Sequence, residues 1–145
     1  MLESIFSQYS DWGLLILRVG LAICFLAHAW FKLDPNGPVK GPAGFAGFLK
    51  QMGIPMPLFF SWLYILIEGA GSILIALGLG TRLIAVGLLI GMIVAIIKVR
   101  IGMGKAKFSG AEGIGWEYEF ILAVGALALV FTGAGMIGLD RFFGL

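Results

Sequence analysis

Charged residues are scarce in this chain. Asp, Glu, Lys and Arg make up 12% of its 145 residues, whereas a soluble domain has about 25%. A soluble fold of 15.5 kDa lacks the interior volume to bury the 60% of residues that are hydrophobic. A net charge of +2 gives no reason to expect a nucleic-acid partner. The composition therefore predicts an integral membrane protein with one domain, residues 1–145.

Cysteine and histidine are equally scarce, with one of each. The lone Cys24 excludes a disulfide within the chain and any site built from several thiolates. The lone His28 cannot form a multi-histidine zinc or haem site. We therefore expect no metal site and no evident cofactor within the chain; the alternative is that His28 supplies a single axial ligand in a complex. Any electrons that the protein handles must then come from the flavin, haem or cluster of a partner.

Long apolar runs are what the chain has instead. Four of them, residues 12–31, 58–79, 83–100 and 116–134, approach the roughly 20 residues needed to cross a bilayer. The runs are continuous and not alternating, so they predict helices and exclude a β-barrel. Gly78, Gly80 and Thr81 predict a tight helical hairpin between the second and third runs, with Thr81 as the N-cap. The sequence thus predicts an all-α four-helix membrane bundle.

The first run has one competing interpretation. Ala27-His28-Ala29 has the small-residue pattern of a signal-peptide cleavage site. However, acidic and not basic residues precede the run, and Arg18 interrupts it. We therefore expect a membrane span here and not a segment that is removed.

The first loop contains all five prolines and a short periodic segment. Four apolar residues recur there at helical spacing: Phe45, Phe48, Leu49 and Met52. This spacing predicts an amphipathic helix over residues 43–52, lying at the membrane interface or folded back over the bundle. An irregular loop is the alternative.

Basic residues are distributed unevenly between the loops. Seven occupy the first and third loops, and two lie on the opposite face: Lys32, Lys40, Lys50, Lys98, Arg100, Lys105 and Lys107 against Arg82 and Arg141. The positive-inside rule then places loops one and three in the cytoplasm and both termini outside the plasma membrane.

Ionisable residues inside the runs are candidates for function, because each costs at least about 2.5–3.5 kcal/mol to insert into a membrane. Arg18 and Glu68 are expected at depths of about 9 and 15 Å from the same boundary, close enough to pair. Such a pair could be functional or could only hold two helices in register. A second group at the opposite face consists of His28, Lys98, Glu117 and Glu119.

Small residues mark one side of the third run. Gly87, Gly91 and Ala95 are spaced four apart, which permits close approach of another helix. That helix could belong to the same chain or to a second copy in a homo-oligomer.

Five short motifs, taken in order, resemble the DoxX family of small four-helix membrane proteins of bacteria and archaea. They are Leu17-Arg18-Val19-Gly20 with His28 and Lys32; Gly44-Phe45-Ala46-Gly47-Phe48-Leu49 with Gly53-Ile54-Pro55; Glu68 before Gly69 and Gly71; Gly78-Leu79-Gly80-Thr81-Arg82; and Tyr118-Glu119-Phe120. The resemblance implies a four-helix bundle whose polar set is Arg18, His28, Glu68 and Glu119. A related branch supplies the quinone-reducing subunit of thiosulfate:quinone oxidoreductase, and other members are linked with membrane redox complexes and with defence against oxidants.

These features leave three candidate functions. In the first, the chain is a subunit of a membrane redox complex that binds a quinone or a similar apolar ligand. Glu68, Glu119 and His28 would then transfer protons, and Arg18 would polarise a carbonyl. In the second it is a non-catalytic anchor for a soluble oxidoreductase, which the basic loops could bind. In the third it is an oligomeric small-molecule permease.

Overall fold

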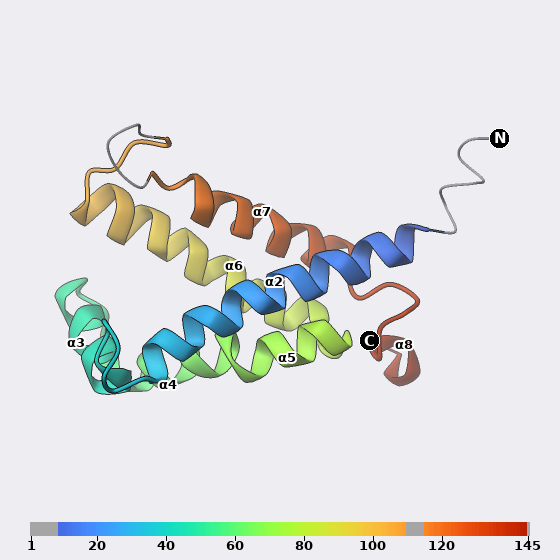
Figure 1. Ribbon diagram of the computed structural model, residues 1–145, viewed down its shortest axis with the longest axis horizontal. Coiled ribbons are helices and arrows are strands. Elements are labelled where there is room, and N and C mark those ends of the chain that lie inside the picture. The colour runs from blue at the N-terminus through green and yellow to red at the C-terminus, as the bar shows by residue number, and fades with distance from the viewer. Residues whose placement is uncertain (1–8, 110–114, 145) are drawn as a thin grey trace.

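The computed structural model describes residues 9–109 and 115–144, and this part of the chain contains helices and no strands (Figure 1). In chain order the elements are α2 (Ser10–Leu33), α3 (Gly41–Gln51), α4 (Pro57–Glu68), α5 (Ala70–Leu77), α6 (Thr81–Val94), the π-helix η1 (Ala95–Met103), α7 (Glu117–Thr132) and α8 (Asp140–Phe143). The predicted all-α fold is confirmed.

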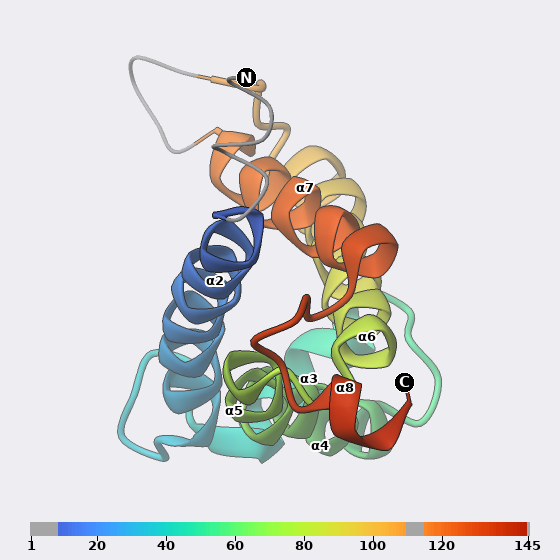
Figure 2. The same cartoon turned by 90° about the vertical axis from the view of Figure 1, so that its right-hand side faces the viewer.

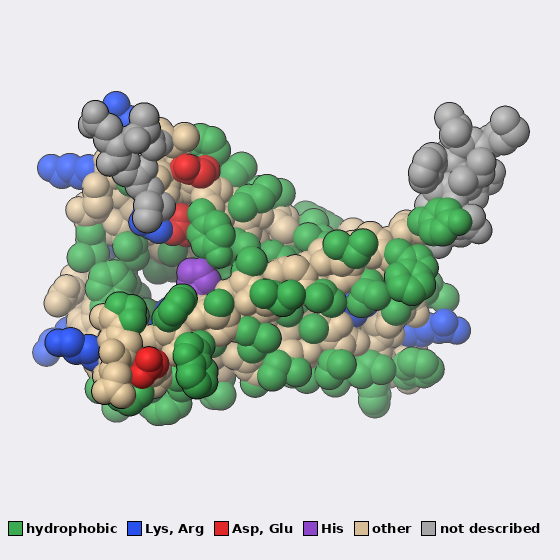
Figure 3. All heavy atoms as spheres, viewed as in Figure 1, with side chains coloured by type: hydrophobic (Ala, Val, Ile, Leu, Met, Phe, Trp, Pro, Cys, Tyr) green, Lys and Arg blue, Asp and Glu red, His purple; other side chains and the backbone are tan. Residues whose placement is uncertain are grey.

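Within the described residues, three stretches are long and apolar enough to cross a membrane: Ser10–Leu33, Pro57–Leu77 and Thr81–Met103. The fourth predicted span corresponds to α7, which at 16 residues is shorter than these three and packs along α6 (Figure 2). Large hydrophobic side chains remain exposed along the whole length of the molecule (Figure 3). This apolar outer surface is what a bundle in contact with lipid requires.

The second span contains a break at Gly69. Its φ and ψ of −84° and −86° depart from helical values and divide the predicted run 58–79 into α4 and α5. A β-carbon at Gly69 would lie 3.0 Å from the carbonyl oxygen of Ile65 and 3.6 Å from the β-carbon of Ala29 in α2. The glycine thus lets α2 approach closely, and it leaves Glu68 as the last residue of α4.

The predicted amphipathic segment 43–52 is α3, which folds back onto α4. Phe45 and Leu49 are buried with Ile65 of α4, and Phe48 and Met52 pack against this cluster. The helical interpretation of this loop is therefore confirmed, and the irregular alternative is wrong.

The third span changes its hydrogen-bonding pattern partway along its length. It is α-helical as far as Val94 and π-helical from Ala95 to Met103. A π-helix is wider than an α-helix and occurs frequently at functional sites. Here it changes the direction of every side chain after Val94. The apolar run 83–100 gave no indication of this change.

The hairpin between α5 and α6 forms at Gly78 and Gly80, whose φ angles are +72° and +63°. The predicted N-cap at Thr81 is wrong, because Thr81 is already the first residue of α6. The carboxylate of Asp140 performs this role: it accepts hydrogen bonds from the backbone N–H groups of Gly80 (2.6 Å) and Thr81 (3.1 Å). A residue distant in sequence thus caps the helix.

Arg18 lies next to this cap. Its side chain is fully buried, and a β-carbon at Gly78 would collide with its guanidinium group. Asp140 is the acidic group that interacts with it electrostatically. The predicted pair between Arg18 and Glu68 is therefore wrong: Arg18 belongs to the hairpin end of the bundle.

The two ends of the bundle differ (Figure 1). The start of α2, the α5–α6 hairpin and α8 lie at one end, and α3 and the loop that follows η1 lie at the other. Which end faces the cytoplasm stays a prediction. Residues 1–8, 110–114 and 145, which the predicted topology includes, lie outside the described part.

We predict that Asp140→Ala destabilises the protein by about 3–5 kcal/mol. The substitution removes the cap of α6 and leaves the buried charge of Arg18 without its acidic neighbour. Thermal unfolding in detergent, followed by circular dichroism, measures the effect. Arg141→Ala, on the exposed next residue, is the control and should melt like the wild type. Equal melting temperatures for both variants would contradict the assigned role.

Candidate functional site

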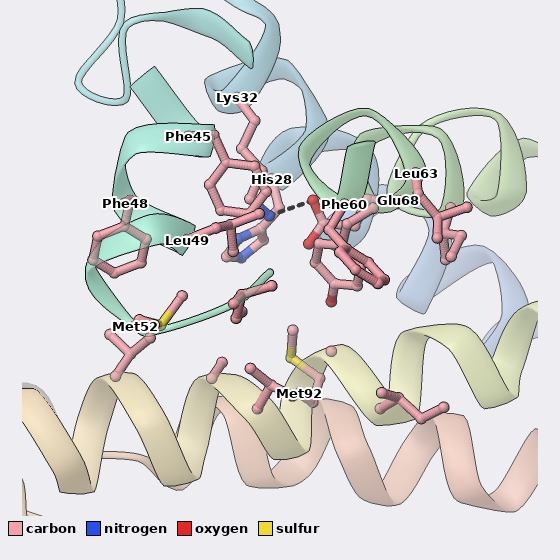
Figure 4. Close-up of a pocket in the computed structure, with 18 of the residues that line it drawn as sticks. His28, Lys32, Phe45, Phe48, Leu49, Met52, Phe60, Leu63, Glu68 and Met92 are labelled. Carbon is pink, nitrogen blue, oxygen red and sulfur yellow. Dashed lines mark hydrogen bonds and ion pairs between the residues drawn. The ribbon is translucent and has the colours of Figure 1, made fainter. Parts of the chain in front are cut away.

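A cavity of about 550 Å³ lies between α2, α3, α4 and the α6–η1 helix. Its size falls within the range of small-molecule sites, which is about 300–1,000 Å³. The walls are predominantly apolar and include Phe45, Phe48, Leu49, Met52, Ile54, Phe60, Leu63, Ile67, Ile90, Met92 and Val99. Figure 4 shows His28, Lys32 and Glu68 on one side of this space and Met92 of α6 on the other. This is the candidate site.

An ion pair between Lys32 and Glu68 forms part of the cavity wall (Figure 4). Glu68 ends α4 at the Gly69 break, and Lys32 lies in the last turn of α2, so the pair joins two spans. The ammonium group also lies 5.0 Å from the centre of the Phe45 ring and 4.9 Å from that of Tyr64. The Lys32 ammonium group therefore makes cation–π contacts with two rings in addition to its ion pair with Glu68.

A second ion pair joins η1 to α7. Arg100 Nε and Nη2 lie 2.7 and 2.6 Å from Oε1 of Glu119, which also lines the cavity. Arg100 was counted among the loop cations and not among the candidate site residues. The π-helical turns bring it to Glu119, and the sequence carries no clear signal for them.

His28 lies near the second ion pair. Its Nε2 is 3.3 Å from the hydroxyl oxygen of Tyr118, and the two rings are stacked with centres 5.8 Å apart. Figure 3 shows a histidine at a hollowed part of the surface, and His28 is the single histidine of the chain. The cavity therefore reaches the surface near α7.

The predicted group of His28, Lys98, Glu117 and Glu119 is only partly brought together. His28 and Glu119 line the cavity. Lys98 and Glu117 are exposed and do not line the cavity. In the π-helix it is Arg100, and not Lys98, that is directed toward α7, and Glu117 is the first residue of α7. Arg18 does not line the cavity either.

Three oxygen atoms of cavity residues lack a hydrogen-bond partner in the described part of the chain. They are the hydroxyl of Tyr64, Oε1 of Glu68 and Oε2 of Glu119. A buried polar atom without a partner costs about 1–3 kcal/mol. These atoms are therefore candidates for hydrogen bonds to a ligand.

The small-residue side of α6 faces α4 of the same chain. A β-carbon at Gly91 would overlap the phenol ring of Tyr64, whereas one at Gly87 would lie 3.2 Å from terminal carbons of Ile67. The missing side chain at Gly91 thus makes room for Tyr64, and the neighbour of the stripe is an intramolecular helix.

We predict that Gly91→Ala displaces Tyr64 and lowers stability by about 1–3 kcal/mol, the usual cost of overpacking. Gly87→Ala is the matched control, since the flexible end of Ile67 can move aside. Thermal unfolding of both variants in detergent measures the difference. The assigned contact would be wrong if Gly87→Ala were as destabilising as Gly91→Ala.

Comparison with known proteins identifies the family. The DoxX family model matches residues 13–101. The chain is 32% identical over 130 residues to "Putative oxidoreductase CatD" of Bacillus subtilis, covering 90% of this chain and 86% of that protein. It is 33% identical to "Uncharacterized membrane protein Rv3486" of Mycobacterium tuberculosis (89% and 80% covered) and 28% identical to "Inner membrane protein YphA" of Escherichia coli (92% and 96%). No solved structure shows a significant match to this chain. The chain belongs to the DoxX family of membrane proteins.

Proposed function

We propose that this protein is a subunit of a membrane redox complex and binds a quinone, or a ligand with a similar apolar ring, in the cavity. The observation that carries the proposal is the cavity itself: a predominantly apolar space of about 550 Å³ whose polar oxygens include three without partners. The name of the related Bacillus subtilis protein supports a redox role.

The residues present fit a quinone. Phenylalanine rings and Met92 offer apolar contacts to a flat ring, and Tyr64 offers a hydroxyl to an oxygen of that ring. When bound, a quinone supplies two-electron chemistry that also consumes two protons. Glu68, Glu119 and His28 are the groups of the cavity that could hold these protons. Arg18, at the other end of the bundle, has no part in this proposal.

The electron donor is proposed to be a partner protein with a flavin, haem or cluster. The cavity lies at the end of the bundle that carries α3 and the third loop, where seven of the ten basic residues lie in sequence. The positive-inside rule makes this the cytoplasmic end, in a cell membrane. A cytoplasmic donor would then approach the end of the bundle at which the cavity lies.

We predict that Ala95→Phe abolishes retention of quinone. Ala95 lines the cavity, so a phenyl ring there fills the space that a ligand ring needs. Mass spectrometry of organic extracts from detergent-purified protein measures the bound quinone per chain. Ile97→Phe, at an exposed position of the same helix, should retain as much quinone as the wild type. Equal retention by both variants, or no quinone in any of the proteins, would contradict the proposal.

We also predict that Glu68→Gln slows quinone reduction by the assembled complex about 10²-fold, because an amide, unlike a carboxylate, cannot take up a proton and pass it to the ligand, and general acid–base catalysis contributes about 10²–10⁴-fold. The rate is measured in membranes that contain the chain and its electron-donating partner. Glu117→Gln removes an exposed carboxylate of α7 and should leave the rate unchanged. A rate for Glu68→Gln equal to that of this control would remove Glu68 from proton transfer.

A further inference from the structure

The unpartnered atoms of the cavity are predominantly hydrogen-bond acceptors. Oε1 of Glu68 and Oε2 of Glu119 are carboxylate oxygens, which accept but do not donate when ionised. A cation contacts the other oxygen of each carboxylate, Lys32 for Glu68 and Arg100 for Glu119, and this contact favours the ionised form. A ligand that fills this cavity must therefore bring donors if the two oxygens are to be satisfied.

Donors on the protein side are mostly engaged already. The ammonium group of Lys32 contacts Glu68 and two aromatic faces, and the guanidinium group of Arg100 is directed to Glu119. His28 shares a hydrogen bond with Tyr118. Among the unpartnered polar atoms of the described cavity residues, the Tyr64 hydroxyl alone can donate, and it lies near the Glu68 carboxylate, with which it interacts electrostatically.

The charges of the two pairs balance, with two carboxylates and two cations. A neutral ligand is thus favoured over a charged one, since a buried charge without a partner is costly. The aromatic and methionine side chains of the wall suit a ring. The ligand that meets these requirements is a neutral aromatic ring with hydroxyl groups.

We propose that the cavity prefers the reduced, dihydroxy form of a quinone over the oxidised form, because a quinol offers two hydroxyl donors to Glu68 and Glu119 whereas a quinone offers only acceptors. This inference rests on the proposed function, since it names the redox form that the same site binds. Tighter binding of the quinol raises the midpoint potential of the bound couple, by about 30 mV for each tenfold difference in affinity.

Anaerobic equilibrium dialysis of the wild-type protein in detergent tests the preference directly. Duroquinol and duroquinone are suitable probes, because their four methyl groups block addition of the Cys24 thiol to the ring. We expect the dissociation constant of duroquinol to be at least tenfold lower than that of duroquinone. Equal affinities, or tighter binding of the quinone, would overturn the inference and leave the proposed function standing. Binding of neither form would overturn both.

Variants assign the preference to the two carboxylates. Glu119→Gln and Glu68→Gln each replace an acceptor with an amide that can donate to a quinone oxygen, so each should reduce the preference to threefold or less. Glu117→Gln, exposed on α7, should keep the wild-type ratio. Tyr64→Phe removes the one free donor and should weaken quinone binding more than quinol binding. The assigned role of the carboxylates would be contradicted if Glu68→Gln and Glu119→Gln both kept the wild-type ratio of the two dissociation constants. Where one variant folds poorly, the other still tests the role.

A second pair of probes, a quinol and a quinone with a decyl tail, identifies the source of the ligand. The preference for the reduced form should persist with the tail. If the tailed probes bind at least tenfold more tightly than duroquinol and duroquinone, the ligand is a membrane quinol whose tail lies in lipid. Affinities that the tail does not improve would indicate a free hydroxylated aromatic compound. Loss of the preference with the tailed probes would overturn the inference for membrane quinols.

Discussion

The ion pair between Lys32 and Glu68 is the interaction on which the site depends. Glu68 is fully buried, and a carboxylate in an apolar bundle persists only if a cation lies against it. The pair needs α2 and α4 in close contact at this level, and the close approach of α2 at Gly69 provides it. The same contact places the Lys32 ammonium between Phe45 of α3 and Tyr64 of α4, so one cation joins three helices. Its position fixes the wall of the cavity.

The two ends of the bundle use buried charge differently. At the hairpin end, both oxygens of the Asp140 carboxylate accept backbone N–H groups, and the fully buried Arg18 lies beside it. Arg18 does not line the cavity, and its guanidinium group lies against Gly78 of the hairpin and near Asp140 of α8. At the opposite end, Glu68 and Glu119 each use one oxygen and leave the other without a partner beside an open space. The carboxylate at the first end caps a helix, and the two carboxylates at the second end line the cavity.

The sequence predicts the helices well and the pairing of their charges poorly. Apolar runs and the spacing of Phe45, Phe48, Leu49 and Met52 identified every long element, because burial of apolar surface depends on local periodicity. The Arg18–Glu68 pair failed because depth along a helix axis does not say which face a side chain occupies. Asp140 was passed over because its partners lie about sixty residues away. Arg100 was missed because the π-helix changes the direction of side chains after Val94, and apolar composition does not distinguish a π-helix from an α-helix.

The π-helix connects these observations to the chemistry of the cavity. An α-helical continuation of α6 would rotate Arg100 away from its present direction, and Glu119 would then face the apolar space without a cation. With the π-helix in place, Arg100 binds Oε1 and leaves Oε2 free, so Glu119 matches the arrangement at Glu68. Two carboxylates from different helices thus present one free oxygen each, and each cation contacts the other oxygen of the same carboxylate. If the cavity binds a ligand as proposed, it discriminates between ligands by the donors that they carry, because an unmatched buried acceptor costs more than a matched one contributes.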